Sequence, residues 1–268
     1  MNRLINKGRP CSGRANLAWV LGLGSVVLAV VLVALLRPFP RQQANPGGKG
    51  TLLVWAAASQ RAPMEQAARA YERRSGYRIE LSFGGSQSLL ANLEISKKGD
   101  LYVPADDSYL EPARAKGLID QTFPLARMTA CLAVPKGNPK QLRSLADLKT
   151  PGVKLAQANP EAAAIGKLVR QALTPAGDWA VLEARTTVFK PNVNDVANDV
   201  KLGSVDAGFI WDAMGPQYPN LELVRVPELA GVRASVAVAV VRHSPQPNEA
   251  LRFARWLADP QQDRKSVV

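Results

Sequence analysis

Histidine and cysteine are scarce in this sequence, with one histidine and two cysteines in 268 residues. A histidine-dependent serine hydrolase needs a base beside its nucleophile, and no Gly-x-Ser-x-Gly turn surrounds any serine. The single histidine, His243, follows an apolar run and precedes Ser244-Pro245, which is typical of a surface residue. Two cysteines and one histidine are also too few for an ordinary zinc site. These absences favour a protein that is not an enzyme and that needs no metal centre or cofactor.

Acidic residues are absent from the first 50 positions, which contain seven basic ones. The whole chain has 34 Lys and Arg against 22 Asp and Glu, so the part after residue 50 has 27 basic and 22 acidic residues, a net charge of +5. No run of basic residues interleaved with aromatic residues occurs in that part. Nucleic-acid binding is therefore not expected.

An uncharged run of 20 residues occupies positions 17–36 and has the length that a helix needs to span a bilayer core. A cleavable signal peptide has a shorter apolar region and a small-residue cleavage site, whereas Arg37-Pro38-Phe39-Pro40 follows here. We predict an uncleaved transmembrane anchor, with cleavage as the alternative. Four basic residues precede the run and three follow it. This slight bias predicts that residues 1–16 form a short cytoplasmic tail and that the large domain lies on the extracytoplasmic side of the cell membrane.

The two cysteines fall on opposite sides of the predicted membrane span, because Cys11 precedes it and Cys131 lies deep in the following domain. No internal disulfide is expected from this arrangement. Cys131 lies in an apolar segment and is predicted to be a small buried side chain.

Pro, Gly and polar residues dominate positions 37–50, which predicts a linker between the anchor and the domain. From residue 51 onward, short apolar runs alternate with helical patterns. Such alternation predicts an α/β fold with mainly parallel sheets flanked by helices. The length of the domain at 51–268 favours two lobes, the first formed by about 51–128 and 229–268 and the second by about 129–228.

Two serines follow the first two predicted strands of this domain, Ser59 after Ala56-Ala57-Ala58 and Ser86 after Gly84-Gly85. Each stands at the entrance of a predicted helix, the second of which is expected over 88–97. In open α/β sheets, ligands bind beyond the carboxyl ends of the strands, where helix N-termini add a partial positive charge. Two such loops side by side can bind an anion without any Lys or Arg. The alternative is that each serine only caps its own helix.

Further motifs accompany these serine loops. They are the segment Asp100-Leu101-Tyr102-Val103-Pro104-Ala105-Asp106, the pair Asn192-Val193, and the sequence Asp206-Ala207-Gly208. Together with Ala56-Ala57-Ala58-Ser59, they make the chain from about residue 51 to 260 resemble the periplasmic molybdate-binding proteins of ABC importers. The resemblance implies the two-lobed clamp of the type II periplasmic binding proteins. It places the ligand-binding serines of that family on Ser59 and Ser86. It places the backbone N–H donors of the family on Ile165 and Val193.

One position departs from the family pattern. A tyrosine that contributes a hydroxyl group in the family falls on Trp211, whose indole N–H can donate a hydrogen bond but cannot accept one. Trp211 is therefore either a ligand donor or a core residue at the end of a strand.

The resemblance implies an extracytoplasmic solute-binding protein of an ABC importer, whose lobes close around a tetrahedral oxyanion such as molybdate or tungstate. The expected partners are the permease and ATPase subunits of the importer and the membrane around the N-terminal helix, and the protein is expected to be a monomer. Because the expected contacts are all donors, a protonated phosphate would need an acceptor, which Asp195 or Asp212 could supply. Two alternatives stay open: a membrane-anchored sensor of an oxyanion, including sulfate or phosphate, and an anchored hydrolase that uses Ser59.

Overall fold

The computed structural model describes residues 49–260. The predicted tail, the predicted transmembrane helix at 17–36 and nearly all of the predicted linker lie outside these residues, so the anchor and its topology stay predictions. Within residues 49–260, no helix combines the length and the apolar character that crossing a membrane requires.

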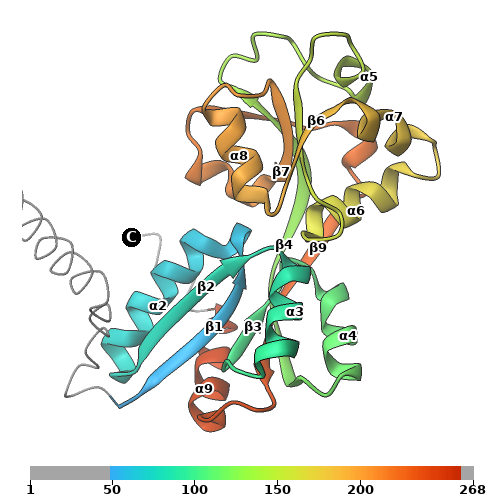
Figure 1. Ribbon diagram of the computed structural model, residues 1–268. Helices are drawn as coiled ribbons and strands as arrows, with labels where there is room; N and C mark the ends of the chain where they lie inside the picture. Colours follow the sequence, from blue (N-terminus) through green and yellow to red (C-terminus); the bar gives the residue numbers. More distant parts are fainter. Residues whose placement is uncertain (1–48, 261–268) are drawn as a thin grey trace, which may run out of the picture. The chain divides into compact units, whose positions relative to one another are not determined.

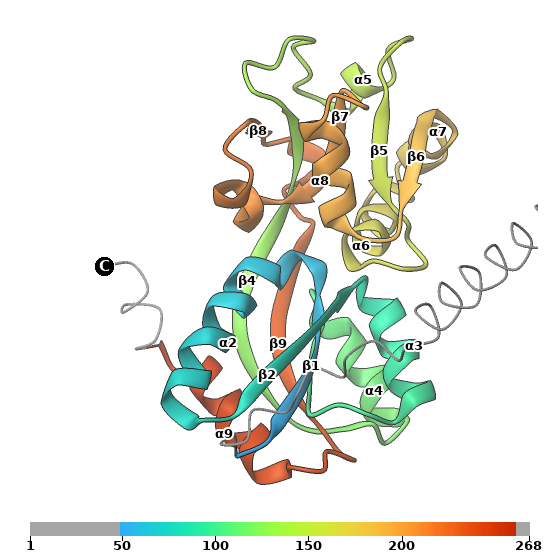
Figure 2. The same ribbon diagram turned by 60° about the vertical axis from the view of Figure 1, so that its left-hand side comes forward.

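The first lobe is built around the strands at the start of the domain, with helices on both sides of its sheet (Figure 1). Strand β1 pairs in parallel with β2 and β3, while β9 runs antiparallel to β3. Figure 2 shows α2 on one side of these strands and α3 and α4 on the other. Leu52, Val54 and Ala56 of β1 are fully buried, as expected for a central strand. The elements are β1 (Thr51–Ala57), η1 (Ala58–Gln60), α2 (Arg61–Ser75), β2 (Arg78–Gly84), α3 (Ser86–Ser96), β3 (Leu101–Val103), η2 (Asp107–Tyr109), α4 (Leu110–Ala115), β9 (Arg233–Val241) and α9 (Pro247–Leu257).

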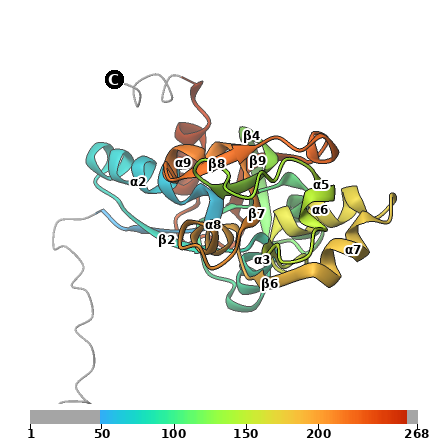
Figure 3. The ribbon, with the colours of Figure 1, turned by 90° about the horizontal axis from the view of Figure 1, so that it is seen from above.

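The second lobe repeats the alternation of strands and helices. Strand β5 pairs in parallel with β6 and β7. Seen from above, α6 and α8 lie on opposite sides of β7 (Figure 3). The elements are α5 (Leu145–Leu148), β5 (Leu155–Ala158), α6 (Ala164–Leu173), α7 (Asp178–Arg185), β6 (Thr186–Lys190), α8 (Val193–Lys201), β7 (Ala207–Trp211), η3 (Asp212–Gln217), β8 (Leu221–Val224) and η4 (Pro227–Leu229).

Strand β4 (Ile119–Pro135) is 17 residues long and belongs to both lobes. Its first part pairs with β9, and its last part pairs with β7 and β8. The strand order is β2-β1-β3-β9-β4-β7-β5-β6, with β8 attached to β4. The lobes are therefore joined through paired strands, and the residue limits predicted for them stay a prediction.

The prediction of mainly parallel sheets is corrected by this topology. The pairings of β9 with β3, and of β4 with β7, β8 and β9, are antiparallel, so the sheet is mixed. A parallel connection needs a crossover, which is usually an α-helix. Between β7 and β9 the chain forms only η3, β8 and η4, so these strands return alongside β4 in the opposite direction.

Individual side chains predicted to be buried or exposed occupy those environments. Cys131 is buried and forms no disulfide. Burial raises the pKa of its thiol to about 12, so the thiol stays protonated. His243 is exposed. Tyr71 of α2 stacks on Phe253 of α9 with 4.4 Å between ring centroids, and its hydroxyl donates to Glu249 Oε1 at 2.6 Å. These contacts attach the last helix to the first lobe.

Candidate functional site

All five residues predicted to bind the ligand line one cavity, which lies where the two lobes meet. Its volume is about 210 Å³, including the open space at its mouth. The lining residues are Ala57, Ala58, Ser59, Gly84, Gly85, Ser86, Ala105, Ala163, Ala164, Ile165, Asn192, Val193 and Trp211.

The two serines lie at the carboxyl ends of neighbouring parallel strands. Ser59 belongs to η1, directly after β1, and Ser86 is the first residue of α3, after β2. Because β1 and β2 are in register, with Ala57 opposite Gly84, both loops open on the same edge of the sheet. The sequence placed the start of α3 at residue 88, two residues too late, since Ser86 already lies inside the helix.

Neither serine caps its helix, so the capping alternative does not hold in this structure. The N-cap residue of α3 is Gly85, which has no side chain, and the N-cap residue of α2 is Gln60, whose side chain makes no capping hydrogen bond. Ser86 Oγ instead accepts from the backbone N–H of Ala105 at 3.0 Å, and Ser59 Oγ accepts from Gln60 Nε2 at 3.2 Å. Within residues 49–260, neither hydroxyl hydrogen has an acceptor. Each hydroxyl therefore keeps a donor that no described residue accepts.

Two helices of the second lobe begin at the same cavity. Ile165 is the second residue of α6, and Val193 is the first residue of α8. The first N–H groups of a helix have no partner within the helix and carry its positive dipole end. With the starts of α3 and of η1 with α2, four helical N-termini surround the cavity, which is a favourable environment for an anion.

Trp211 is buried and also lines the cavity, so both interpretations of this residue stay open. It ends β7 with only 1% of its surface exposed, and it lines the cavity. Among the described residues, its indole N–H has no hydrogen-bond partner. The indole nitrogen is not among the fully buried atoms that lack a partner in the described residues, so it can donate to water or to a ligand.

Among residues 49–260, no Asp, Glu, Lys, Arg or His lines this cavity. Both aspartates considered as acceptors are engaged elsewhere. Asp212 Oδ1 accepts from the backbone N–H of Thr129 at 2.9 Å, and Asp195 Oδ2 accepts from Asn192 Nδ2 at 2.8 Å. Asn192 also uses its own Oδ1, which accepts from the Asp195 N–H at the start of α8. The polar groups of the described lining are therefore neutral, and the rest of its surface is apolar.

Asp100 and Tyr102 belong to one motif and do not line the cavity; Tyr102 supports the Ser86 loop, whereas Asp100 holds the start of β1. The Tyr102 hydroxyl donates to the backbone oxygen of Ser86 at 2.9 Å, and burial raises its pKa. Asp100 is buried and accepts from the Leu53 N–H and the Ser244 hydroxyl. The sequence identified this segment by resemblance but gave no sign of these roles, because the partners are distant along the chain.

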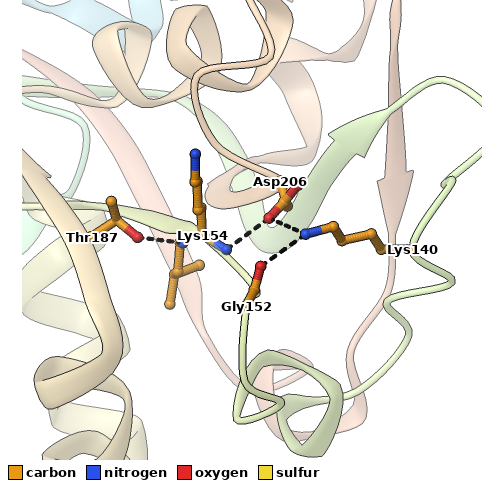
Figure 4. A network of polar contacts seen from close by, with 6 residues as sticks. Lys140, Gly152, Lys154, Thr187 and Asp206 are labelled. Atoms are coloured by element: carbon orange, nitrogen blue, oxygen red, sulfur yellow. Dashed lines mark hydrogen bonds and ion pairs between the residues drawn. The ribbon is translucent and has the colours of Figure 1, made fainter.

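Asp206 does not line the cavity and connects two loops of the second lobe through hydrogen bonds (Figure 4). Its Oδ2 accepts from Lys140 Nζ and from the Lys154 N–H, both at 2.7 Å, and Lys140 Nζ also donates to the Gly152 oxygen at 2.9 Å. Burial acts to raise the pKa of Asp206, but the hydrogen bonds and charges of Lys140 and Lys154 outweigh it and lower the pKa. This aspartate is structural.

Comparisons with known proteins identify the family of this chain. The model of the bacterial extracellular solute-binding protein family matches residues 52–264. The molybdate-binding protein ModA of Mycobacterium tuberculosis H37Rv is 29% identical over 238 residues, covering 87% of this chain and 89% of the relative.

Solved structures with the same fold differ in the ligands that their names state. The periplasmic molybdate-binding protein of Azotobacter vinelandii superposes with a TM-score of 0.67 at 21% identity, covering 78% of this chain and 94% of its own. The sulfate-binding protein SubI of M. tuberculosis superposes with a TM-score of 0.66 at 17% identity, covering 79% of this chain and 83% of its own. At these identities the superpositions establish a periplasmic-binding-protein fold, and the choice of ligand depends on the cavity.

Proposed function

The chain belongs to the bacterial extracellular solute-binding protein family, and from this premise we propose that it captures a tetrahedral oxyanion, most favourably molybdate or tungstate, for an ABC importer. The family consists of binding proteins, in agreement with the prediction that the chain is not an enzyme. The proposed partners are a permease and an ATPase in the membrane to which the N-terminal segment would attach the domain.

The observation that carries this proposal is the convergence of unpaired donors on one small cavity. The hydroxyls of Ser59 and Ser86 and the indole of Trp211 lack acceptors within the described residues, and the N-termini of α6 and α8 face the same space. Hydrogen bonds from neutral donors to a charged oxygen are stronger than neutral pairs. Such a set can compensate a dianion for its lost hydration without a cationic side chain.

The absence of a carboxylate from the described lining favours an oxyanion that carries no proton. A phosphate that keeps a proton would direct it at other donors, which leaves the proton unpaired and costs roughly 1–3 kcal/mol. Neither Asp195 nor Asp212 lines the cavity, and each already accepts a hydrogen bond within the protein, so we assign to neither the acceptor that would admit phosphate. Molybdate, tungstate and sulfate therefore rank above phosphate.

The choice among the three rests on relatives and on the second lobe. The relatives at 28–29% identity are named molybdate-binding proteins. The fold itself does not decide, because a protein named for sulfate shares it. The larger indole of Trp211, where the family has a tyrosine, alters one wall of the cavity and is the side chain most able to shift the preference.

Calorimetric titration of the purified full-length chain with molybdate, tungstate, sulfate and phosphate tests this function. We expect molybdate or tungstate to bind more tightly than sulfate, and phosphate most weakly. Equal or tighter binding of sulfate would overturn the molybdate assignment. Binding of none of the four anions would overturn the oxyanion proposal itself.

A further inference from the structure

Gly85 lies beside the cavity, where the backbone of the first lobe closely approaches that of the second. A Cβ atom built on Gly85 would lie 2.3 Å from the Ala162 oxygen and 2.7 Å from the Pro191 oxygen, both of which belong to the second lobe. Real Cβ atoms essentially never approach closer than 3.0 Å. Both obstacles are backbone atoms, so no side-chain rotation can relieve the overlap.

The local conformation of Gly85 does not itself require glycine. Its φ of −69° and ψ of 146° are ordinary extended values, which alanine adopts without strain. The requirement for a missing side chain therefore comes from the approach of the other lobe alone.

The residues on either side of this contact connect it with the cavity. Gln87, two residues after Gly85, donates its backbone N–H to the same Ala162 oxygen at 3.0 Å, while Ser86 between them faces the cavity. Ala162 leads into α6 and Pro191 into α8, the two helices that begin at Ile165 and Val193. The positions of both second-lobe donors are thus set by how closely this lobe approaches Gly85.

We propose that Gly85 permits the two lobes to close around the ligand, because its missing side chain lets the Ala162 and Pro191 carbonyls reach the start of α3. This inference rests on the proposed function, in which closure completes the binding site. Another contact across the lobes is made by Lys167, whose Nζ donates to Ser108 Oγ at 3.0 Å and lies 4.5 Å from the centroid of the Tyr109 ring. A long side chain can adjust to a change in lobe spacing, whereas the backbone contact at Gly85 cannot.

The test uses Gly85→Ala and a matched control, Gly231→Ala. At Gly231 an added Cβ meets nothing within 4 Å and φ is not positive, so the control makes the same chemical change without a clash. Distances between spin labels report closure, with labels on Ile95→Cys in the first lobe and Leu202→Cys in the second, both strongly exposed. Cys131 is buried and can stay, and Cys11→Ser removes the remaining thiol.

We expect molybdate to shorten the label distance in the parent and in Gly231→Ala but not in Gly85→Ala. The affinity of Gly85→Ala should fall by about 100-fold or more, since donors from both second-lobe helices are displaced and each charge-assisted hydrogen bond is worth roughly a tenfold factor or more. Its melting temperature without ligand should equal or slightly exceed that of the parent, because replacing glycine lowers the entropy of the unfolded chain.

Closure and affinity equal to those of the parent in Gly85→Ala would overturn the proposal. A large loss of stability without ligand would also overturn it, because glycine would then be needed by the fold and not by closure. If the parent binds none of the four oxyanions, the proposed function fails separately. The ligand-free distances then decide on Gly85: a short-distance population that Gly85→Ala loses supports the proposal, and identical distributions contradict it.

Discussion

Removal of the Ser59 or Ser86 hydroxyl should separate ligand binding from folding stability, because the two hydroxyls accept different hydrogen bonds. Ser59 Oγ accepts from the side chain of Gln60, whose Nε2 also lies 3.5 Å from Met128 Sδ. Ser86 Oγ accepts from the backbone N–H of Ala105, a buried residue. In Ser59→Ala the Gln60 side chain loses its acceptor but can find another one. In Ser86→Ala the buried N–H of Ala105 is left without an acceptor.

The two substitutions should therefore weaken molybdate binding alike and differ in stability. Each removes one hydrogen bond to a charged group, worth about 1.5–3 kcal/mol, so the affinity should fall by roughly 10- to 150-fold in both variants. Ser86→Ala should also destabilise the ligand-free protein by about 1–3 kcal/mol, the usual cost of an unpaired buried donor. For a domain of this size that corresponds to a melting temperature lower by roughly 2–12 °C. Ser59→Ala should melt close to the parent.

Calorimetric titration and ligand-free thermal melts measure the two effects on the same samples. Ser88→Ala is the matched control, since Ser88 is exposed and lies two residues after Ser86 in α3. If both serine variants bind molybdate as tightly as Ser88→Ala does, the ligand does not contact these hydroxyls and the proposed site is wrong. If the melting temperature of Ser86→Ala equals that of Ser88→Ala, water must accept from the Ala105 N–H in the variant, and the hydrogen bond to Ser86 Oγ is unimportant for stability.

Three further predictions concern Trp211, Asp206 and the N-terminal anchor. Trp211→Phe should lose about tenfold or more in affinity together with the fluorescence change on oxyanion binding, and unchanged binding with the full signal would make Trp211 a core residue only. Asp206→Asn should lower the free energy of unfolding at pH 7 by about 1–2 kcal/mol in denaturant titrations. The pKa of Asp206 is lower in the folded state, so its contribution to the free energy of unfolding is complete above the unfolded pKa of about 3.9. This contribution disappears as the pH falls through the folded pKa, and the free energies of unfolding of the parent and of Asp206→Asn should then become equal. A difference that persists at low pH would contradict this assignment. Protease added to spheroplasts should digest the domain, and full protection would contradict an extracytoplasmic domain on a membrane anchor.

The cavity could be predicted from the sequence to the extent that its residues follow strands. Ser59 and Ser86 come directly after the apolar runs of β1 and β2, and the carboxyl ends of parallel strands meet at one edge of a sheet. Ile165, Val193 and Trp211 came from resemblance alone, since nothing in their own segments marks a donor. Their presence in one lining follows from how the second lobe approaches the first.

Features that depend on distant partners could not be predicted. Whether Ser86 caps α3 or supports another loop is decided by Ala105, 19 residues away, which no local pattern reveals. The length of β4 was missed because Pro124 and the polar residues before Met128 interrupt its apolar pattern, and the strand continues there only through pairing with β9. The same long-range pairing produced the mixed sheet in place of a mainly parallel one.

The lining of the cavity contains no ionisable side chain, and this has a consequence for where the protein can work. A receptor that recognises its ligand through lysine, arginine, histidine or carboxylate groups gains or loses protons as the surroundings change, and its affinity changes with them. Here the protein would contribute only hydroxyl, indole and backbone donors, which stay the same across the whole range of habitable pH. Acidification would then limit uptake only where the anion itself takes up a proton, so environmental chemistry, and not titration of the receptor, would set the boundary of its use.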